Sequence, residues 1–205
     1  MENSEKTWRE VCAVLEGETG TIRRTAPRIV ALGYPAPYSV AASSLGFQSV
    51  YRALNGSAEL ACERFFAVEG SALAKPLRTA ESGFPVRGAA AIGFSVACET
   101  ELAKVAGLLE AADTTPLACE RGPGDPLVIA GGPITFLDPR LLAALADVVV
   151  VGEGEEALPA IRAAVAVAAD KREMLSALDG AAPGLWVPSA REEPATPAAA
   201  PHPAT

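Results

Sequence analysis

The side chains that could do chemistry in this sequence are few, and most of them stand just after apolar runs. Glu99 and Glu101 form a spaced pair of carboxylates, an arrangement that can share acid–base catalysis. Cys98 precedes them and could meet a ligand as a thiol. Attraction to the helix dipole explains carboxylates at a helix start more simply, and burial explains a thiol beside an apolar strand. The sequence therefore predicts no catalytic residues.

Glycines follow two strongly apolar runs, Pro126-Leu-Val-Ile-Ala-Gly-Gly-Pro133 and Asp147-Val-Val-Val-Val-Gly-Glu-Gly-Glu-Glu156. An uninterrupted Val/Ile run is typical of a strand buried on both faces of a parallel sheet. Glycine at its end lets backbone approach a flat ligand closely, although Gly-Gly-Pro is also an ordinary turn signal. The second run ends in carboxylates with no following lysine, which excludes a P-loop and argues against ATP or GTP hydrolysis. We expect a binding surface here.

Elements that would position this surface alternate along the chain. Strands are predicted at residues 28–34, 60–66 and 89–97 and from about Leu127 and Val148 within the two apolar runs, with a short closing strand at 185–187. Helices are predicted at residues 46–54 and 99–112, from about 138, and at 155–169 and 171–178. This alternation predicts an α/β fold with a doubly wound, mostly parallel five-stranded sheet in flavodoxin-like (Rossmann-like) order and helices on both faces. The first strand is then central, with its carboxyl end at the crevice.

Composition limits the class of protein. The 205 residues are 50% hydrophobic, enough for one well-buried domain, and the net charge of −8 argues against nucleic acid as a partner. No signal peptide or membrane span is recognisable, so we expect a cytoplasmic protein. The cysteines lack paired spacing and are predicted to be reduced, mostly buried thiols without a metal site. They are Cys12, Cys62, Cys98 and Cys119.

Three regions are predicted from these patterns. Residues 1–27 would form a helical arm, with a short amphipathic helix at about 6–16. Residues 28–190 would form the α/β domain. Residues 191–205 are rich in proline and alanine, contain the single histidine, His202, and are predicted to be a disordered tail.

Seven short blocks occur in order between about residues 28 and 188. They are Gly33-Tyr-Pro, Ser44-Leu-Gly-Phe-Gln-Ser-Val-Tyr-Arg-Ala-Leu-Asn55, Cys62-Glu-Arg-Phe-Phe66, Ile92-Gly-Phe-Ser95, Pro126-Leu-Val-Ile-Ala-Gly-Gly-Pro133, Gly152-Glu-Gly-Glu-Glu156 and Gly184-Leu-Trp-Val-Pro188. Together they resemble the N-terminal domain of cobalamin-binding radical SAM proteins. The resemblance implies a Rossmann-like cobalamin-binding fold.

The same resemblance implies where a cofactor would lie. The loop at residues 35–46 would face the lower side of the corrin and admit its nucleotide tail. The cofactor-binding candidates are Tyr38, Ser43, Ser44, Gly46, Ser95, Gly131, Gly132, Gly152 and Gly154. Ordinary readings remain open, since a serine here could cap a helix and aromatic residues at strand ends, Tyr34, Tyr38 and Phe94, usually belong to the core.

Two departures from the resemblance matter. The chain has no Cys-x-x-x-Cys-x-x-Cys motif, which predicts no iron–sulfur cluster on it. Where histidine-ligating cobalamin domains carry Asp-x-His-x-x-Gly, this sequence reads Ala41-x-Ser43-x-x-Gly46. Any cobalamin would therefore be bound without a histidine lower ligand.

Two functions remain open. The first is a stand-alone cobalamin-binding module that acts with a separately encoded radical SAM partner. The second is a degenerate domain without cofactor that serves as a protein-interaction or regulatory subunit. A nicotinamide or flavin enzyme comes last, because Gly-x-Gly-x-x-Gly is missing after the first strand, where the chain reads Gly33-Tyr-Pro-Ala-Pro-Tyr38.

Overall fold

The structure is a computed structural model that describes residues 9, 12–13, 15–68 and 75–198. One sheet forms its centre. Its strands are β1 (Arg28–Tyr34), β2 (Leu60–Phe66), β3 (Ala91–Ser95), β4 (Leu127–Gly131), β5 (Val148–Val150) and β6 (Leu185–Trp186). They form one six-stranded sheet in the order β2-β1-β3-β4-β5-β6, in which only β6 is antiparallel to its neighbour. The predicted flavodoxin-like order is confirmed, and the predicted closing strand adds a sixth member to the five.

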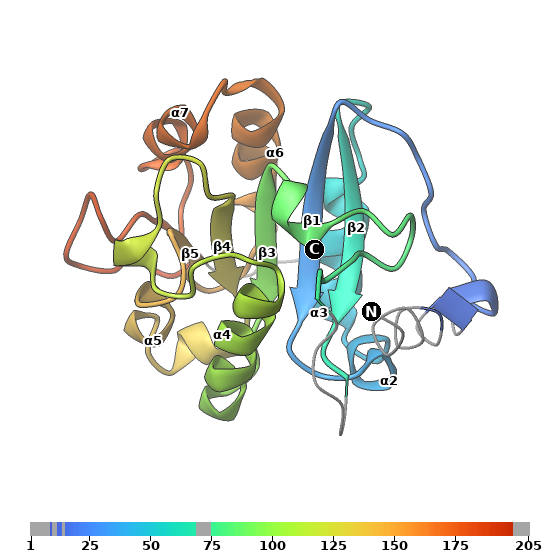
Figure 1. Ribbon diagram of the computed structural model, residues 1–205. Coiled ribbons are helices and arrows are strands. Elements are labelled where there is room, and N and C mark those ends of the chain that lie inside the picture. The colour runs from blue at the N-terminus through green and yellow to red at the C-terminus, as the bar shows by residue number, and fades with distance from the viewer. Residues whose placement is uncertain (1–8, 10–11, 14, 69–74, 199–205) are drawn as a thin grey trace, which may run out of the picture.

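Helices cover both faces of the sheet, as predicted (Figure 1). The longer ones are α3 (Leu45–Leu54), α4 (Leu102–Ala111), α6 (Leu158–Val167) and α7 (Lys171–Leu178), with short turns of helix at α2 (Tyr38–Ala41) and α5 (Arg140–Ala143). One core cluster joins the sheet to α3, α6 and α7, and a second joins it to α4 and α5. The two faces are therefore separately packed, which defines a doubly wound fold.

Helices α3 and α7 each begin directly after a residue whose side chain caps the helix. Ser44 accepts a hydrogen bond from the Phe47 amide at the start of α3, and Asp170 accepts one from Glu173 at the start of α7. Before α5, Pro139 occupies the N-cap position, and the carboxylate of the preceding Asp138 accepts from the Arg140 amide at 3.0 Å. These side chains satisfy amides that have no partner within the helix.

Strand β2 lies at the edge of the sheet, but every residue in it is buried. Its buried arginine, Arg64, is the centre of an ion cluster. Its Nε donates to Glu81 at 2.6 Å, its two terminal nitrogens donate to Glu18 at 2.8 and 2.6 Å, and its guanidinium lies 4.3 Å from the centre of the Tyr51 ring. The cluster ties the segment before β1 and the loop after β2 to the edge strand.

Glu18 makes the strength of this cluster dependent on pH. Its hydrogen bonds from Arg64 hold the pKa of its carboxyl below the usual 4.5. A group with a lowered pKa in the folded state contributes stability above pH 4.5, and the contribution is lost as pH falls through the folded-state value. We expect Glu18→Gln to lower the free energy of unfolding by about 1–2 kcal/mol at pH 7, and by progressively less below pH 4.5, in urea titrations at fixed pH.

The comparison must be made against the parent protein at each pH, because burial raises the pKa of Glu81 and so gives the opposite slope. Glu16→Gln, at an exposed neighbouring position, is the control and should change little. A loss at Glu18 that stays constant between pH 3 and 7 would contradict this assignment.

Residues that follow β6 do not leave the fold at Arg191, where the sequence predicted a disordered tail. The Trp186 indole donates to the Arg191 carbonyl at 2.8 Å, and Ala198 is only 4% exposed and forms a parallel bridge with Gly152. The structure thus differs from the tail prediction at residues 191–198, where backbone hydrogen bonds and small side chains hold the segment against the fold without a large apolar surface. Residues 199–205, including His202, lie outside the described residues.

The N-terminal helix and the cysteines were also predicted from the sequence. Of the predicted helix at about 6–16, residues 9, 12, 13, 15 and 16 are described and helical, and the others lie outside the described residues. All the cysteines are free, but only Cys62 is buried, and Cys119 is exposed. No helix in the described part of the chain is long and apolar enough to cross a membrane.

Candidate functional site

The carboxyl ends of β1, β3, β4 and β5 lie along one edge of the sheet, because these strands are parallel. We call the segments that follow them the carboxyl rim: residues 35–46, 96–101, 131–138 and 151–157. Figure 1 shows β1 and β2 pointing toward α2, which belongs to this rim. Open α/β sheets bind ligands here, where the strand order reverses between β1 and β3. All the predicted cofactor residues lie on or beside the rim.

The loop after β1 uses its polar groups within the chain. Ser44 caps α3, and the Ser43 hydroxyl donates to the Val40 carbonyl at 2.7 Å. The Tyr38 ring packs edge-on against Phe66, with the ring centres 5.4 Å apart, and burial raises the pKa of its hydroxyl. Gly46 is different, because a Cβ there would meet no atom within 4 Å. The capping interpretation of Ser44 is confirmed, and of these positions Gly46 faces open space.

Aromatic side chains fill the space at the end of β1. Tyr34 lies edge-on to Phe47 with ring centres 5.2 Å apart, and Phe65 lies edge-on to Phe94 at 5.6 Å. The Phe65 and Phe94 rings lie so close to Gly33 that a Cβ on Gly33 would overlap them. Tyr34 and Phe94 are buried core residues. The aromatic groups near the reversal of strand order therefore pack on one another.

Gly131 and Gly132 allow neighbouring strands and loops to approach. A Cβ on Gly131 would lie 3.0 Å from both the Cβ and the carbonyl oxygen of Val150. Gly132 has φ +116°, and a Cβ there would lie 2.6 Å from the Val96 oxygen. The Val96 amide donates to the Gly131 carbonyl at 2.8 Å. The close approach predicted for these glycines is therefore made by the protein's own backbone.

The two glycines after β5 differ from each other. Gly152 has φ +82°, and a Cβ there would lie 2.6 Å from the oxygen of Ala198. The segment after β6 therefore fills the space beside the Gly152 Cα. Gly154 has open space around the position of a Cβ. Among the predicted glycines, Gly46 and Gly154 are thus the two left accessible to a ligand.

The carboxylates and the thiol after β3 have structural partners. Glu101 is 9% exposed, and its Oε2 accepts a hydrogen bond from the Ala97 amide at 2.7 Å. Cys98 is half-buried, with its sulfur 3.1 Å from the Thr100 hydroxyl oxygen. Ser95 ends β3 beside Gly131 and is half-buried. Glu101 therefore holds the backbone between β3 and the following helix, a structural role that differs from the dipole interaction the sequence suggested.

The predicted cofactor residues thus fall into two groups. One group contacts or hydrogen-bonds other parts of this chain: Ser43, Ser44, Gly131, Gly132 and Gly152. The other group, Gly46 and Gly154, faces open space. Separately, the described residues contain no group of three His, Cys, Asp or Glu side chains placed to hold a metal ion.

A different property of the rim was missed by the sequence analysis. Four large apolar side chains on it are exposed: Val40 at 45%, Leu45 at 84%, Phe136 at 61% and Leu137 at 71%. They come from the loops after β1 and β4, whereas Glu99, Glu155 and Glu156 are exposed on the loops after β3 and β5. No rim segment contains Lys, Arg or His. Apolar and acidic loops therefore alternate along the rim in the order β1, β3, β4, β5.

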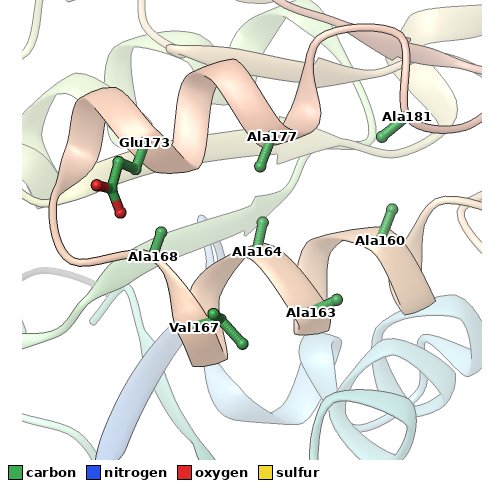
Figure 2. A pocket seen from close by; sticks show the side chains of 8 residues that line it. All are labelled: Ala160, Ala163, Ala164, Val167, Ala168, Glu173, Ala177 and Ala181. Carbon is green, nitrogen blue, oxygen red and sulfur yellow. The ribbon is translucent and has the colours of Figure 1, made fainter.

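A groove of about 500 Å³ lies elsewhere, between α6 and α7 (Figure 2). Its lining is Ala160, Ala163, Ala164, Val167, Ala168, Glu173, Ala177 and Ala181. The Glu173 carboxylate accepts from the Ala169 amide at 2.7 Å and so belongs to the turn between the helices. Small side chains allow the two helices to approach, which explains the alanines without a ligand.

The fold and a comparison with known proteins both place the chain in a known class. Its sheet order and its layers are those of a flavodoxin-like α/β domain. The family described as radical SAM proteins, N-terminal, matches residues 46–188. The chain therefore belongs to this family of N-terminal domains. A search of curated proteins gave no match.

Proposed function

We propose that this domain is a docking module of a radical SAM system: it holds no cofactor, and it binds a radical SAM domain through its carboxyl rim. The observation that carries the proposal is the rim's pattern of exposed apolar and acidic loops, together with the internal packing of its glycines and serines. Membership of the radical SAM N-terminal family supplies the kind of partner. The proposal applies whether that partner is carried on the same chain or on another.

The rim also specifies the chemistry of the partner surface. Exposed apolar groups such as Phe136 and Leu45 gain free energy when they are removed from water, and large side chains of this kind commonly anchor interfaces. Around them the rim carries only acidic charge. The complementary surface would thus carry two apolar patches with Lys or Arg between and beside them, and the acidic loops would speed encounter with it at low salt.

Binding of a recombinant radical SAM domain with Cys-x-x-x-Cys-x-x-Cys, from the same organism, tests this proposal. The Leu45→Ser and Phe136→Ser variants should each bind at least about 10-fold more weakly by calorimetry, as expected for interface anchors. Both side chains are exposed, so the variants should keep the parent's thermal unfolding temperature. Binding should also weaken as NaCl is raised from 50 to 300 mM.

Val167→Ser is the matched control. Val167 is 84% exposed, like Leu45, but it ends α6 and lies outside the rim. Equal loss of binding in this variant, or unchanged binding in both rim variants, would reject the rim as the docking surface.

Cobalamin binding without a histidine ligand is the second candidate, and the accessible positions Gly46 and Gly154 favour it. Incubation with hydroxocobalamin, desalting and a visible spectrum separate the two. The docking proposal expects a colourless protein. Retained corrin absorbance that is lost in Gly46→Leu or Gly154→Leu would support the cofactor instead, and these positions can be enlarged without an internal clash.

A further inference from the structure

A niche beside the end of β5 holds residue Ala198. Two glycines form it: Gly152, with φ +82°, and Gly184, with φ +75°. A Cβ on Gly152 would lie 2.6 Å from the Ala198 oxygen, and one on Gly184 would lie 3.3 Å from the Ala198 Cβ. Both glycines belong to short blocks of the sequence that were attributed to a cofactor fold. In the structure they converge on a peptide segment.

The segment is held as an added strand would be. The Ala198 amide donates to the Val151 carbonyl at 3.1 Å, and the Glu153 amide donates to the Ala198 carbonyl at 3.3 Å. These two bonds straddle Gly152 and give the parallel bridge between Gly152 and Ala198. Gly184 lies just before β6, and its carbonyl accepts from Val151 at 2.8 Å. Ala198 thus extends the margin of the sheet from the point where β6 begins.

Side-chain size is restricted at one position of this segment. Ala198 is 4% exposed and its side chain faces Gly184, whereas Thr196 and Pro197 are exposed. Two hydrogen bonds and one buried methyl group are a modest attachment, which favours exchange between bound and released states. Main-chain bonds that give affinity, with a pocket that selects one side chain, are the features of peptide binding by strand addition.

We propose that Gly152 and Gly184 form a peptide-binding niche, that its ligand is an extended segment with alanine at the buried position, and that residues 195–198 are its resident, exchangeable occupant. The niche adjoins the loop after β5, so its occupancy determines whether this end of the carboxyl rim is covered. The inference does not depend on docking to a radical SAM domain, since the niche is defined by its own contacts.

Amide hydrogen exchange in the full-length protein tests the first half of the proposal. In Ala198→Leu the larger side chain should not enter the niche, so the Glu153 amide should exchange at least about 10-fold faster. The Val151 amide, bonded to Gly184 rather than to the segment, should be unchanged and serves as the internal control. Thr196→Leu adds the same kind of bulk at an exposed position and should leave Glu153 protected. Unchanged exchange at Glu153 in Ala198→Leu would overturn the assignment of the occupant.

A synthetic peptide of residues 192–200 tests the second half. Added at millimolar concentration to the Ala198→Leu protein, it should restore the protection of Glu153 and shift the amide signals of Gly152 and Gly184. The parent protein should require a higher peptide concentration, because its own segment competes at a high effective concentration. The peptide with Thr196→Leu should bind equally well, and the peptide with Ala198→Leu should not bind. Failure of the natural peptide to protect the variant would show that the niche holds only its covalently attached segment.

Discussion

The Arg64→Met variant is expected to lose about 3–5 kcal/mol of its free energy of unfolding, the typical effect of removing one partner from a buried ion pair. The Arg64 side chain is 1% exposed, and so is that of Glu81. Without the guanidinium, the Glu81 carboxylate would be buried without its cation, and the Glu18 carboxylate would lose two hydrogen bonds. Urea denaturation at pH 7 measures the loss.

Two further variants make this result specific. Arg140→Met removes a surface ion pair with Asp138, in which the arginine side chain is 71% exposed, and should change stability by less than about 1 kcal/mol. Arg64→Met combined with Glu81→Gln removes the buried charge while keeping an acceptor for the Arg64 backbone amide, which bonds to Glu81 at 2.6 Å. The double variant should be more stable than Arg64→Met alone. If it is not, the charge of Glu81 is not what destabilises the single variant.

Gly132→Ala is expected to destabilise the fold by about 2–6 kcal/mol, which combines the effect of a positive φ with that of overpacking. The added Cβ would lie 2.6 Å from the oxygen and 2.9 Å from the nitrogen of Val96. Both atoms belong to backbone that is fixed by the end of β3, so neither can move without disturbing the sheet. Thermal or chemical unfolding of the purified variant measures the effect.

Gly154→Ala is the matched control for this substitution. It lies on the same rim, and a Cβ there meets no atom within 4 Å, so its effect should stay within about 0.5 kcal/mol. A large loss at Gly154, or a negligible one at Gly132, would contradict the account of the rim glycines. The pair also shows why a cofactor test should avoid Gly132, because its enlargement disturbs the fold with or without a ligand.

The fold could be predicted from the sequence because apolar runs such as 127–131 and 148–151 are typical of strands that are buried on both faces. The helix start at Ser44 could be recognised because a cap acts on amides two or three residues away. The alternation of strands and helices predicted a doubly wound sheet, of which the flavodoxin-like order is one of two common forms.

The site was harder to predict, because a glycine indicates that another group lies close to it but does not identify that group. Gly132 and Gly152 meet the backbone of Val96 and Ala198, which are distant in sequence. The Arg64 cluster likewise joins residues 17 and 46 positions apart, and its only local signal was the pair of charges in Cys62-Glu-Arg-Phe-Phe66. Sequence patterns of period two or 3.6 cannot reveal such distant partners.

The margins of the sheet have a consequence for how this protein behaves in concentrated solution. At the β2 margin, the backbone of Arg64 is hydrogen-bonded to the Glu81 carboxylate and to the Ala80 amide. At the other margin, β6 is only two residues long, and Ala198 pairs with Gly152 beside it. Exposed strand margins are templates on which chains polymerise into fibrils. Capped in this way, the domain should remain dispersed at high concentration, and its self-association, if any, should involve side chains rather than intermolecular β-pairing.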